Sequence, residues 1–281
     1  MRKMSILLAG VLIFGACAAP VGSPAASPTA TAPVTAASPT PTAKPPLKTI
    51  KVGVIPISNM VPLYAAQKLG YFADNGLTVE TTAATQGAAL VSAVVGGSLD
   101  FSYSNYISLL AARAQSIDVV AFANMNNVQL KAPNSTSVTV RASDNITSPK
   151  DLVGKTIAVS VLNALPWLYA RSWLRVHGVD PNSVKYVEVP FPNMGDALAT
   201  KQVDAAVSTE PFNAILIKAG SVKTIGYPYV ESQPGLNLAG WISTSDWVSK
   251  NQATAKAFVT AIDKAVKYLA DNPSQKIALT A

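Results

Sequence analysis

Short β-rich runs alternate with helical stretches from residue 49 onward, and this pattern constrains the fold more than any other feature of the chain. The first run, Thr49–Ile57, is followed by a helical stretch at Val61–Leu69 that ends at Gly70. Strands that alternate with helices of this length are typical of βαβ units, in which helices cover a mainly parallel sheet. The sequence therefore predicts an α/β fold.

The alternation falls into two series of similar size, which predicts two lobes with one sheet in each. We expect lobe 1 over residues 49–139, lobe 2 over residues 140–237 and a return to lobe 1 over residues 238–281. The further elements expected in lobe 1 are Leu77–Thr82, Gly87–Val95, Asp100–Tyr103, Tyr106–Ala114 and Asp118–Ala123. Those expected in lobe 2 are Thr156–Ser160, Pro166–His177, Val184–Val189, Gly195–Thr200, Ala205–Val207 and Pro211–Ala219.

Two elements are expected to lie in the returning segment. Leu238–Ser243 is predicted to be a strand and Asn251–Ala270 a helix. Apolar residues recur along this helix at the spacing of a single buried face: Ala255, Phe258, Ile262, Val266 and Leu269. We expect that face to pack on lobe 1.

Residues 1–17 have the features of a lipoprotein-type signal peptide. Arg2 and Lys3 precede a largely apolar run, Met4–Ala16, that is too short to span a bilayer. The segment ending in Cys17, the only cysteine, resembles a bacterial lipobox, although Phe14 stands where Leu, Val or Ile is usual. We expect lipidation of Cys17; the alternative is a plain signal peptide that removes Cys17 or leaves it as a free thiol.

Residues 18–48 are rich in Ala, Pro, Ser and Thr and contain neither acidic nor aromatic residues. Such a segment buries too little apolar surface to offset its ordering entropy, and its prolines favour extended conformations. We expect a disordered tether that holds the folded domain near the membrane. A glycosylated or unselected spacer has the same composition.

The chain carries 22 basic and 15 acidic residues, a net charge of +7. The excess is spread thinly, and the sequence lacks the runs of Lys and Arg that bind nucleic acid. We therefore expect no nucleic-acid partner. A mild positive field favours an anionic ligand or an anionic lipid surface only weakly.

Few residues of the chain point to catalysis. The single histidine, His177, lies just before Gly178 at the end of a predicted helix, where the helix dipole favours a cation. One histidine and one cysteine do not form the usual metal clusters, and neither a nucleophile elbow nor a phosphate-binding glycine loop is present. The sequence does not exclude catalytic sites built on Ser, Lys or carboxylate side chains, but we expect that the protein is not an enzyme and binds neither a metal nor a cofactor.

Several sequence pieces occur in a fixed order: Gly70-Tyr71-Phe72, Asn75–Glu80, Ser148–Val159, Val203–Ala206 and Glu210-Pro211-Phe212. Together they resemble the nitrate, sulfonate and thiamine-precursor group of substrate-binding proteins that serve ABC importers. The similarity covers most of Thr49–Pro273. Members usually continue for several helices beyond the segment that matches Ala270–Pro273, so the resemblance implies a truncated reading frame or a smaller first lobe.

The resemblance implies a type II periplasmic binding protein. In that fold two α/β lobes are joined by two crossing strands, the ligand lies in the cleft, and the lobes close by hinge bending. The partners it implies are a small-molecule ligand and an ABC permease in the membrane, and we expect a monomer. Some relatives of this fold are enzymes of thiamine-precursor synthesis, but the export signal argues against that activity here.

The strand-to-helix turns are the candidate ligand sites. In open parallel sheets, ligands bind beyond the carboxyl ends of the strands, where helix N-termini present unpaired N–H groups. The candidates are Ser58, Asn59, Gln86, Ser104 and Asn105 in lobe 1 and Asn163, Asn193 and Glu210 in lobe 2. Ser, Asn and Thr are also the usual N-cap residues, so any one of them could cap a helix without touching a ligand.

Aromatic residues cluster near the same turns: Tyr103, Tyr106, Trp167, Tyr169 and Phe191. An aromatic pair suits a flat ring such as a pyrimidine or a flavin. Tyr103 and Trp167 are the candidates, because Trp167 lies in the first turn of the helix that Pro166 opens. Ordinary packing between helices is the alternative for Trp167.

Glu210 is the one carboxylate expected at a helix start in the cleft. It could accept hydrogen bonds from an amino group or a ring N–H, or it could stabilise the dipole of the helix that follows. No Arg or Lys stands as clearly at a strand end, and Arg141 is expected to be structural. We therefore expect the ligand to be a neutral or amino-bearing organic molecule in preference to a small inorganic anion.

These observations predict an extracytoplasmic, lipid-anchored solute-binding component of an ABC importer, whose cleft closes over its ligand and delivers it to the permease. Two alternatives stay open. One is an extracytoplasmic sensor that presents a ligand to a receptor, and the other is a binding protein for a small oxyanion such as a sulfonate or nitrate.

Overall fold

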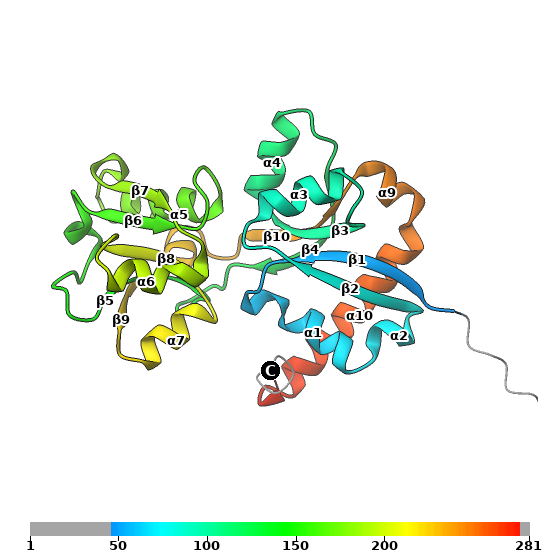
Figure 1. Cartoon of the computed structure of the whole chain (residues 1–281). Helices are drawn as coiled ribbons and strands as arrows, with labels where there is room; N and C mark the ends of the chain where they lie inside the picture. The colour runs from blue at the N-terminus through cyan, green and yellow to red at the C-terminus, as the bar shows by residue number, and fades with distance from the viewer. Residues whose placement is uncertain (1–45, 276–281) are drawn as a thin grey trace, which may run out of the picture. The chain divides into compact units, whose positions relative to one another are not determined.

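A computed structural model describes residues 46–275 and contains two five-stranded sheets with flanking helices (Figure 1). The predicted α/β class with one sheet in each lobe is confirmed. The expected signal peptide, Cys17 and nearly all of the expected tether lie outside the described residues. Among residues 46–275, no helix is both long and apolar enough to cross a membrane.

The first sheet has the strand order β2-β1-β3-β10-β4. β1 pairs in parallel with β2 and β3, whereas β10 runs antiparallel to β3 and β4. The strands are β1 (Lys48–Val54), β2 (Leu77–Ala83), β3 (Phe101–Asn105), β4 (Val120–Asn127) and β10 (Asn237–Ser243). The expected return strand at Leu238–Ser243 is thereby confirmed as β10.

Helices cover both faces of the first sheet. Figure 1 shows α3 and α4 on one face and α1 and α10 on the other. The helical elements of this lobe are η1 (Ser58–Met60), α1 (Val61–Lys68), α2 (Tyr71–Asp74), α3 (Gly87–Val95), α4 (Tyr106–Ala114), α9 (Ser245–Lys250) and α10 (Gln252–Asp271).

The second sheet has the order β7-β6-β8-β5-β9. β6 pairs in parallel with β7 and β8, and β5 runs antiparallel to β8 and β9. The strands are β5 (Thr136–Arg141), β6 (Thr156–Val159), β7 (Lys185–Glu188), β8 (Ala205–Thr209) and β9 (Val222–Gly226). The helical elements are η2 (Pro149–Leu152), α5 (Leu165–Val176), η3 (Pro181–Ser183), η4 (Phe191–Asn193), α6 (Met194–Ala199), α7 (Phe212–Lys218) and α8 (Pro228–Ser232).

The chain crosses between the sheets twice, once before β5 and once before β10. The first crossing lies between Asn127 and Thr136, a few residues before the boundary expected at Thr139, because all of β5 pairs with β8 or β9. The second lies between Ser232 and Asn237. Each crossing delivers an antiparallel strand into the interior of the sheet that it joins.

Aromatic packing joins the helices and strands of the first lobe. The Phe101 ring on β3 lies 4.7 Å from the Phe258 ring on α10 and 6.0 Å from the Trp241 ring on β10, measured between centroids. The expected packing of the last helix on lobe 1 is thereby confirmed. Its apolar stripe is not buried throughout, however, because Val266 is 48% exposed.

Candidate functional site

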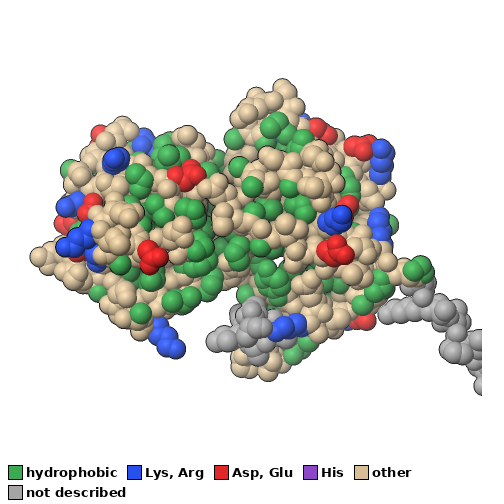
Figure 2. Space-filling model, in the orientation of Figure 1, with side chains coloured by type: hydrophobic (Ala, Val, Ile, Leu, Met, Phe, Trp, Pro, Cys, Tyr) green, Lys and Arg blue, Asp and Glu red, His purple; other side chains and the backbone are tan. Residues whose placement is uncertain are grey.

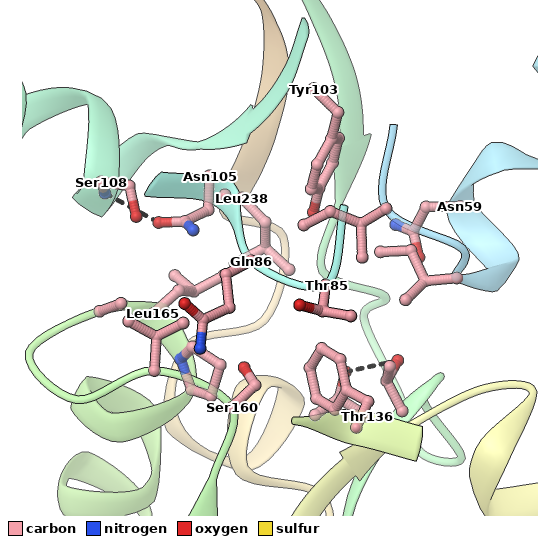
Figure 3. A pocket seen from close by; sticks show the side chains of 18 of the residues that line it. Asn59, Thr85, Gln86, Tyr103, Asn105, Ser108, Thr136, Ser160, Leu165 and Leu238 are labelled. Atoms are coloured by element: carbon pink, nitrogen blue, oxygen red, sulfur yellow. Dashed lines mark hydrogen bonds between the residues drawn. The ribbon is translucent and has the colours of Figure 1, made fainter. Parts of the chain in front are cut away.

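A cavity of about 70 Å³ lies between the two sheets (Figure 3). Its polar lining consists of Asn59, Thr85, Gln86, Tyr103, Asn105, Ser108, Ser135, Thr136, Ser160, Thr209 and Tyr229. Its apolar lining comes from Ile55, Ile57, Val161, Ala164, Leu165, Pro166, Phe191 and Leu238, together with Gly87. Both lobes therefore contribute polar and apolar atoms.

Many of the lining residues lie in or just beyond the carboxyl-terminal parts of parallel strands. Tyr103 belongs to β3, and Thr85 and Gln86 follow β2; in the second lobe Ser160 follows β6 and Thr209 ends β8. Figure 3 shows the first-lobe side chains facing those of the second lobe across the cavity. This is the edge of an open α/β sheet at which ligands bind.

Three helices begin at this cavity, and two of them have no side-chain cap. Gln86 precedes α3 and Ala164 precedes α5 without capping either helix. Asn105, in contrast, caps α4, because its Oδ1 accepts a hydrogen bond from the N–H of Ser108 at 2.8 Å. The first N–H groups of α3 are thus available to a ligand, as are those of Leu165 and Trp167 in α5, where Pro166 has none. The positive dipole ends of both helices face the cavity region.

Among the described residues, no side chain that lines the cavity carries a formal charge. Its two tyrosines are buried, and this burial raises the pKa of both Tyr103 and Tyr229 above the ordinary value of 10.0. For Tyr229 the neighbouring Tyr103 and Tyr169 raise the pKa further, against a smaller lowering by a hydrogen bond with Thr136. Both phenols are therefore neutral hydrogen-bonding groups at physiological pH.

The seam between the lobes is also poor in charge on its outer surface. On the face shown in Figure 2 it carries mostly hydrophobic and uncharged side chains. The Glu188 carboxylate is an exception, because it contacts Gln86 of the opposite lobe. Arg141, expected to be structural, pairs with Asp144 at 2.7 Å and Asp204 at 3.6 Å inside the second lobe.

The volume of the cavity limits the size of a molecule that fits the lobes as they stand. The cavity measures about 70 Å³. Pockets for drug-sized ligands span roughly 300–1,000 Å³. The cavity therefore suits a compound of only a few non-hydrogen atoms.

Comparison with known proteins assigns the chain to a family. The family described as NMT1/THI5 like matches residues 57–276. The chain belongs to the NMT1/THI5-like family. This assignment confirms the resemblance to the nitrate, sulfonate and thiamine-precursor group of binding proteins.

Curated relatives of this NMT1/THI5-like chain include two binding proteins of known ligand. The taurine-binding periplasmic protein of Escherichia coli (strain K12) is 27% identical over 213 residues, and the alignment covers 75% of this chain and 64% of that protein. The formylaminopyrimidine-binding protein of Halalkalibacterium halodurans is 24% identical over 217 residues, and the alignment covers 76% of this chain and 64% of that protein. The chain thus spans about 64% of the length of these relatives.

Solved structures show the same fold. The alkanesulfonate-binding protein SsuA from Xanthomonas axonopodis pv. citri, bound to MOPS, superposes with a TM-score of 0.72 at 18% identity, and the match covers 83% of this chain and 78% of that one. The periplasmic nitrate-binding protein NrtA from Synechocystis PCC 6803 superposes with a TM-score of 0.66 at 17% identity. That match covers 83% of this chain and 65% of NrtA. The predicted fold of a two-lobed periplasmic binding protein is therefore confirmed.

The structure brings four of the predicted site residues of this NMT1/THI5-like chain together. Asn59, Gln86, Tyr103 and Asn105 all line the cavity. Asn105 also caps α4, so helix capping and a place in the cavity lining coincide at this residue. Asn59 and Gln86 follow strands of the first lobe and Asn105 ends β3, where the strand-end rule places ligand contacts, whereas Tyr103 lies within β3.

Ser58 and Glu210 lie instead in a neighbouring groove of about 890 Å³. The Glu210 carboxylate accepts a hydrogen bond from the N–H of Ala214 at 2.9 Å, so it caps the first turn of α7. Its backbone oxygen accepts from the N–H of Ser58 at 3.0 Å, which joins the two lobes. The carboxylate expected to meet an amino group of the ligand is thus engaged by its own helix.

Four further candidates lie away from the cavity. Ser104 is fully buried within β3, opposite Gly240, and Asn163 and Asn193 are exposed beside their turns. The Trp167 ring packs on Tyr186 at 6.2 Å and under the Arg171 guanidinium at 4.8 Å. Trp167 therefore packs against neighbouring side chains of its own lobe, which is the alternative to a ligand contact.

Some lining residues were not among the sequence candidates. Ser160 ends a strand that the sequence did predict, so the same strand-end rule could have found it. Thr136 starts the crossing strand β5 and Ser135 precedes it, and Tyr229 lies on α8, which was not predicted. Their positions depend on long-range pairing, for which the local sequence carries no signal.

The two buried tyrosines predict a loss of stability in alkali. A folded-state pKa above the unfolded value of 10.0 gives stability that is fully present below pH 10 and is lost as the pH rises toward the folded pKa. Each such tyrosine contributes a slope of up to ~1.4 kcal/mol per pH unit in the free energy of unfolding. Tyr229→Phe should therefore lose stability less steeply than the wild type above pH 10 in urea unfolding, and equal slopes would contradict this assignment.

Proposed function

We propose that this chain is the substrate-binding component of an ABC-type importer, and that the cavity between its sheets holds the transported molecule. The observation that carries the proposal is an uncharged cavity where strand ends of both sheets meet the uncapped N-termini of α3 and α5. The relatives that bind taurine and formylaminopyrimidine support a small-molecule ligand. The protein binds and releases this ligand without chemical change, as a monomer.

The lining favours a ligand that is rich in hydrogen-bond acceptors. The free N–H groups of α3 and α5 donate, as can the hydroxyls of Thr85 and Ser160. An oxyanion such as a sulfonate, or a carbonyl group, matches such donors, and the helix dipoles supply positive potential without a cationic side chain. An amine gains little here, because Glu210 is engaged with α7.

Closure of the lobes is the proposed means of capture. Both connections between the lobes lie at the crossing segments 128–135 and 233–236, which act as a hinge. A ligand that contacts both lobes binds the closed form better than the open form and so shifts the population toward it. The closed form then presents the loaded cavity to a permease.

A thermal-shift panel with a cavity-filling variant tests the ligand site. Gly87 lines the cavity, and a Cβ at this position meets no heavy atom within 4 Å, so Gly87→Trp should place a large ring in the cavity. Taurine, methanesulfonate, nitrate and uracil serve as probes. At 100-fold excess over its Kd, a binding compound should raise the melting temperature of the wild type by roughly 5–10 °C.

The matched control for this variant is Ala88→Trp, which places the same ring on the exposed neighbour in α3. We expect the compound that stabilises the wild type to stabilise Ala88→Trp equally and to leave Gly87→Trp unshifted. A compound that stabilises Gly87→Trp as much as the wild type binds elsewhere, and this result would remove the cavity from the proposal.

The proposal places the protein outside the cytoplasm, anchored to the membrane by a lipid on Cys17. The support is the export-signal pattern of residues 1–17 and the periplasmic location of the taurine-binding relative. In a bacterial host the wild type should fractionate with membranes, and Cys17→Ser should move to the soluble fraction. Intact mass of the membrane-bound form should exceed that of the cleaved chain by a diacylglycerol and an acyl group; equal fractionation of both forms argues against the anchor.

A further inference from the structure

A side-chain hydrogen bond joins the two lobes at the exposed edge of the cavity. Gln86 Nε2 donates to Glu188 Oε1 at 2.8 Å. Gln86 precedes α3 in the first lobe and lines the cavity, whereas Glu188 is the exposed last residue of β7 in the second lobe. The bond therefore spans the gap that has to open before a ligand can enter or leave.

The carboxylate of Glu188 is held in place by its own lobe. Its second oxygen, Oε2, accepts a hydrogen bond from the N–H of Leu162 at 3.0 Å. Leu162 belongs to the loop between β6 and α5, which supplies Ser160, Val161 and Ala164 to the cavity lining. One carboxylate thus fixes a cavity loop with one oxygen and presents the other to the opposite lobe.

Gln86 is also suited to this contact. Glutamine is not among the usual N-cap residues, and here its side chain makes no cap hydrogen bond to α3. The amide is therefore free to reach across the cavity edge, and the first N–H groups of α3 remain uncapped. A shorter Ser or Asp at this position would favour capping α3 over reaching the second lobe.

We propose that Gln86 and Glu188 form a latch that stabilises the closed form and slows the escape of the bound ligand. The role of the latch in ligand capture rests on the proposed function. The hydrogen bond that defines the latch forms without a ligand. A charge-assisted hydrogen bond at an exposed site contributes modestly, so the latch tunes the open-to-closed ratio and does not by itself determine it.

The latch is tested by the distance between two spin labels in the ligand-free full chain. Labels at Gln115→Cys in the first lobe and Lys150→Cys in the second, both exposed, report on opening in a Cys17→Ser background. Glu188→Ala removes the acceptor, and Gln86→Glu places two carboxylates opposite each other. Both variants should raise the ratio of long to short label separations by roughly two- to five-fold.

Two controls separate a latch from a local effect on the loop at Leu162. The double variant Gln86→Glu/Glu188→Gln restores the pair with donor and acceptor exchanged, and it should return the short separation of the wild type. Glu80→Ala removes an exposed carboxylate on β2 and should leave the distances unchanged. An absence of the short separation in the wild type, unchanged distances in both single variants, or a double variant that stays open would each overturn the latch.

The spin-label experiment uses no ligand and is therefore independent of the ligand screen. A failed ligand screen leaves the evidence for the latch standing, and a failed latch leaves the proposal of ligand binding untouched.

Discussion

The antiparallel insertion of β5 and β10 is the constraint on which the rest of this structure depends. β10 lies between β3 and β4 in the first sheet, and β5 lies between β8 and β9 in the second. Each of these strands reaches its sheet by crossing from the other lobe. Neither sheet is complete until the chain has crossed, so the two lobes are joined by two connections, residues 128–135 and 233–236.

This topology brings the ligand-binding edges of two sheets face to face. In a single open sheet, the strand ends and helix N-termini face solvent, and a small molecule held there stays exposed. Here the ends of β3 and β8, with the starts of α3 and α5, enclose a cavity without a charged side chain among the described residues. Hydrogen bonds to a ligand gain strength when water is excluded, because the local dielectric falls. Closure and recognition therefore depend on the same geometry.

Local sequence signals predicted the elements that local physics determines. The helices at Gly87–Val95 and Tyr106–Ala114 are confirmed with the same bounds, because their starts and ends have clear signals such as Asn105 and Gly96. β9 and α8 were not predicted. β9 pairs only with β5, which is distant in sequence, and α8 has five residues and starts at a proline.

The candidate site was predicted in part for the same reason. The strand-end rule identified the right class of turn and led to Asn59, Gln86 and Asn105. Which turns face the cavity depends on how the second lobe is oriented, and the sequence does not specify this. Glu210 and Trp167 show the difference: both lie at the start of a helix, as expected, but one caps α7 and the other packs on Tyr186.

Capture of a small molecule between the two sheets is tested most directly by a crystal structure of the full chain with a stabilising compound. We expect density for the compound between Gly87 and Ser160, in contact with residues of both lobes. Density confined to the groove beside Tyr64 and Glu210, or to the surface of one lobe, would contradict capture between the sheets.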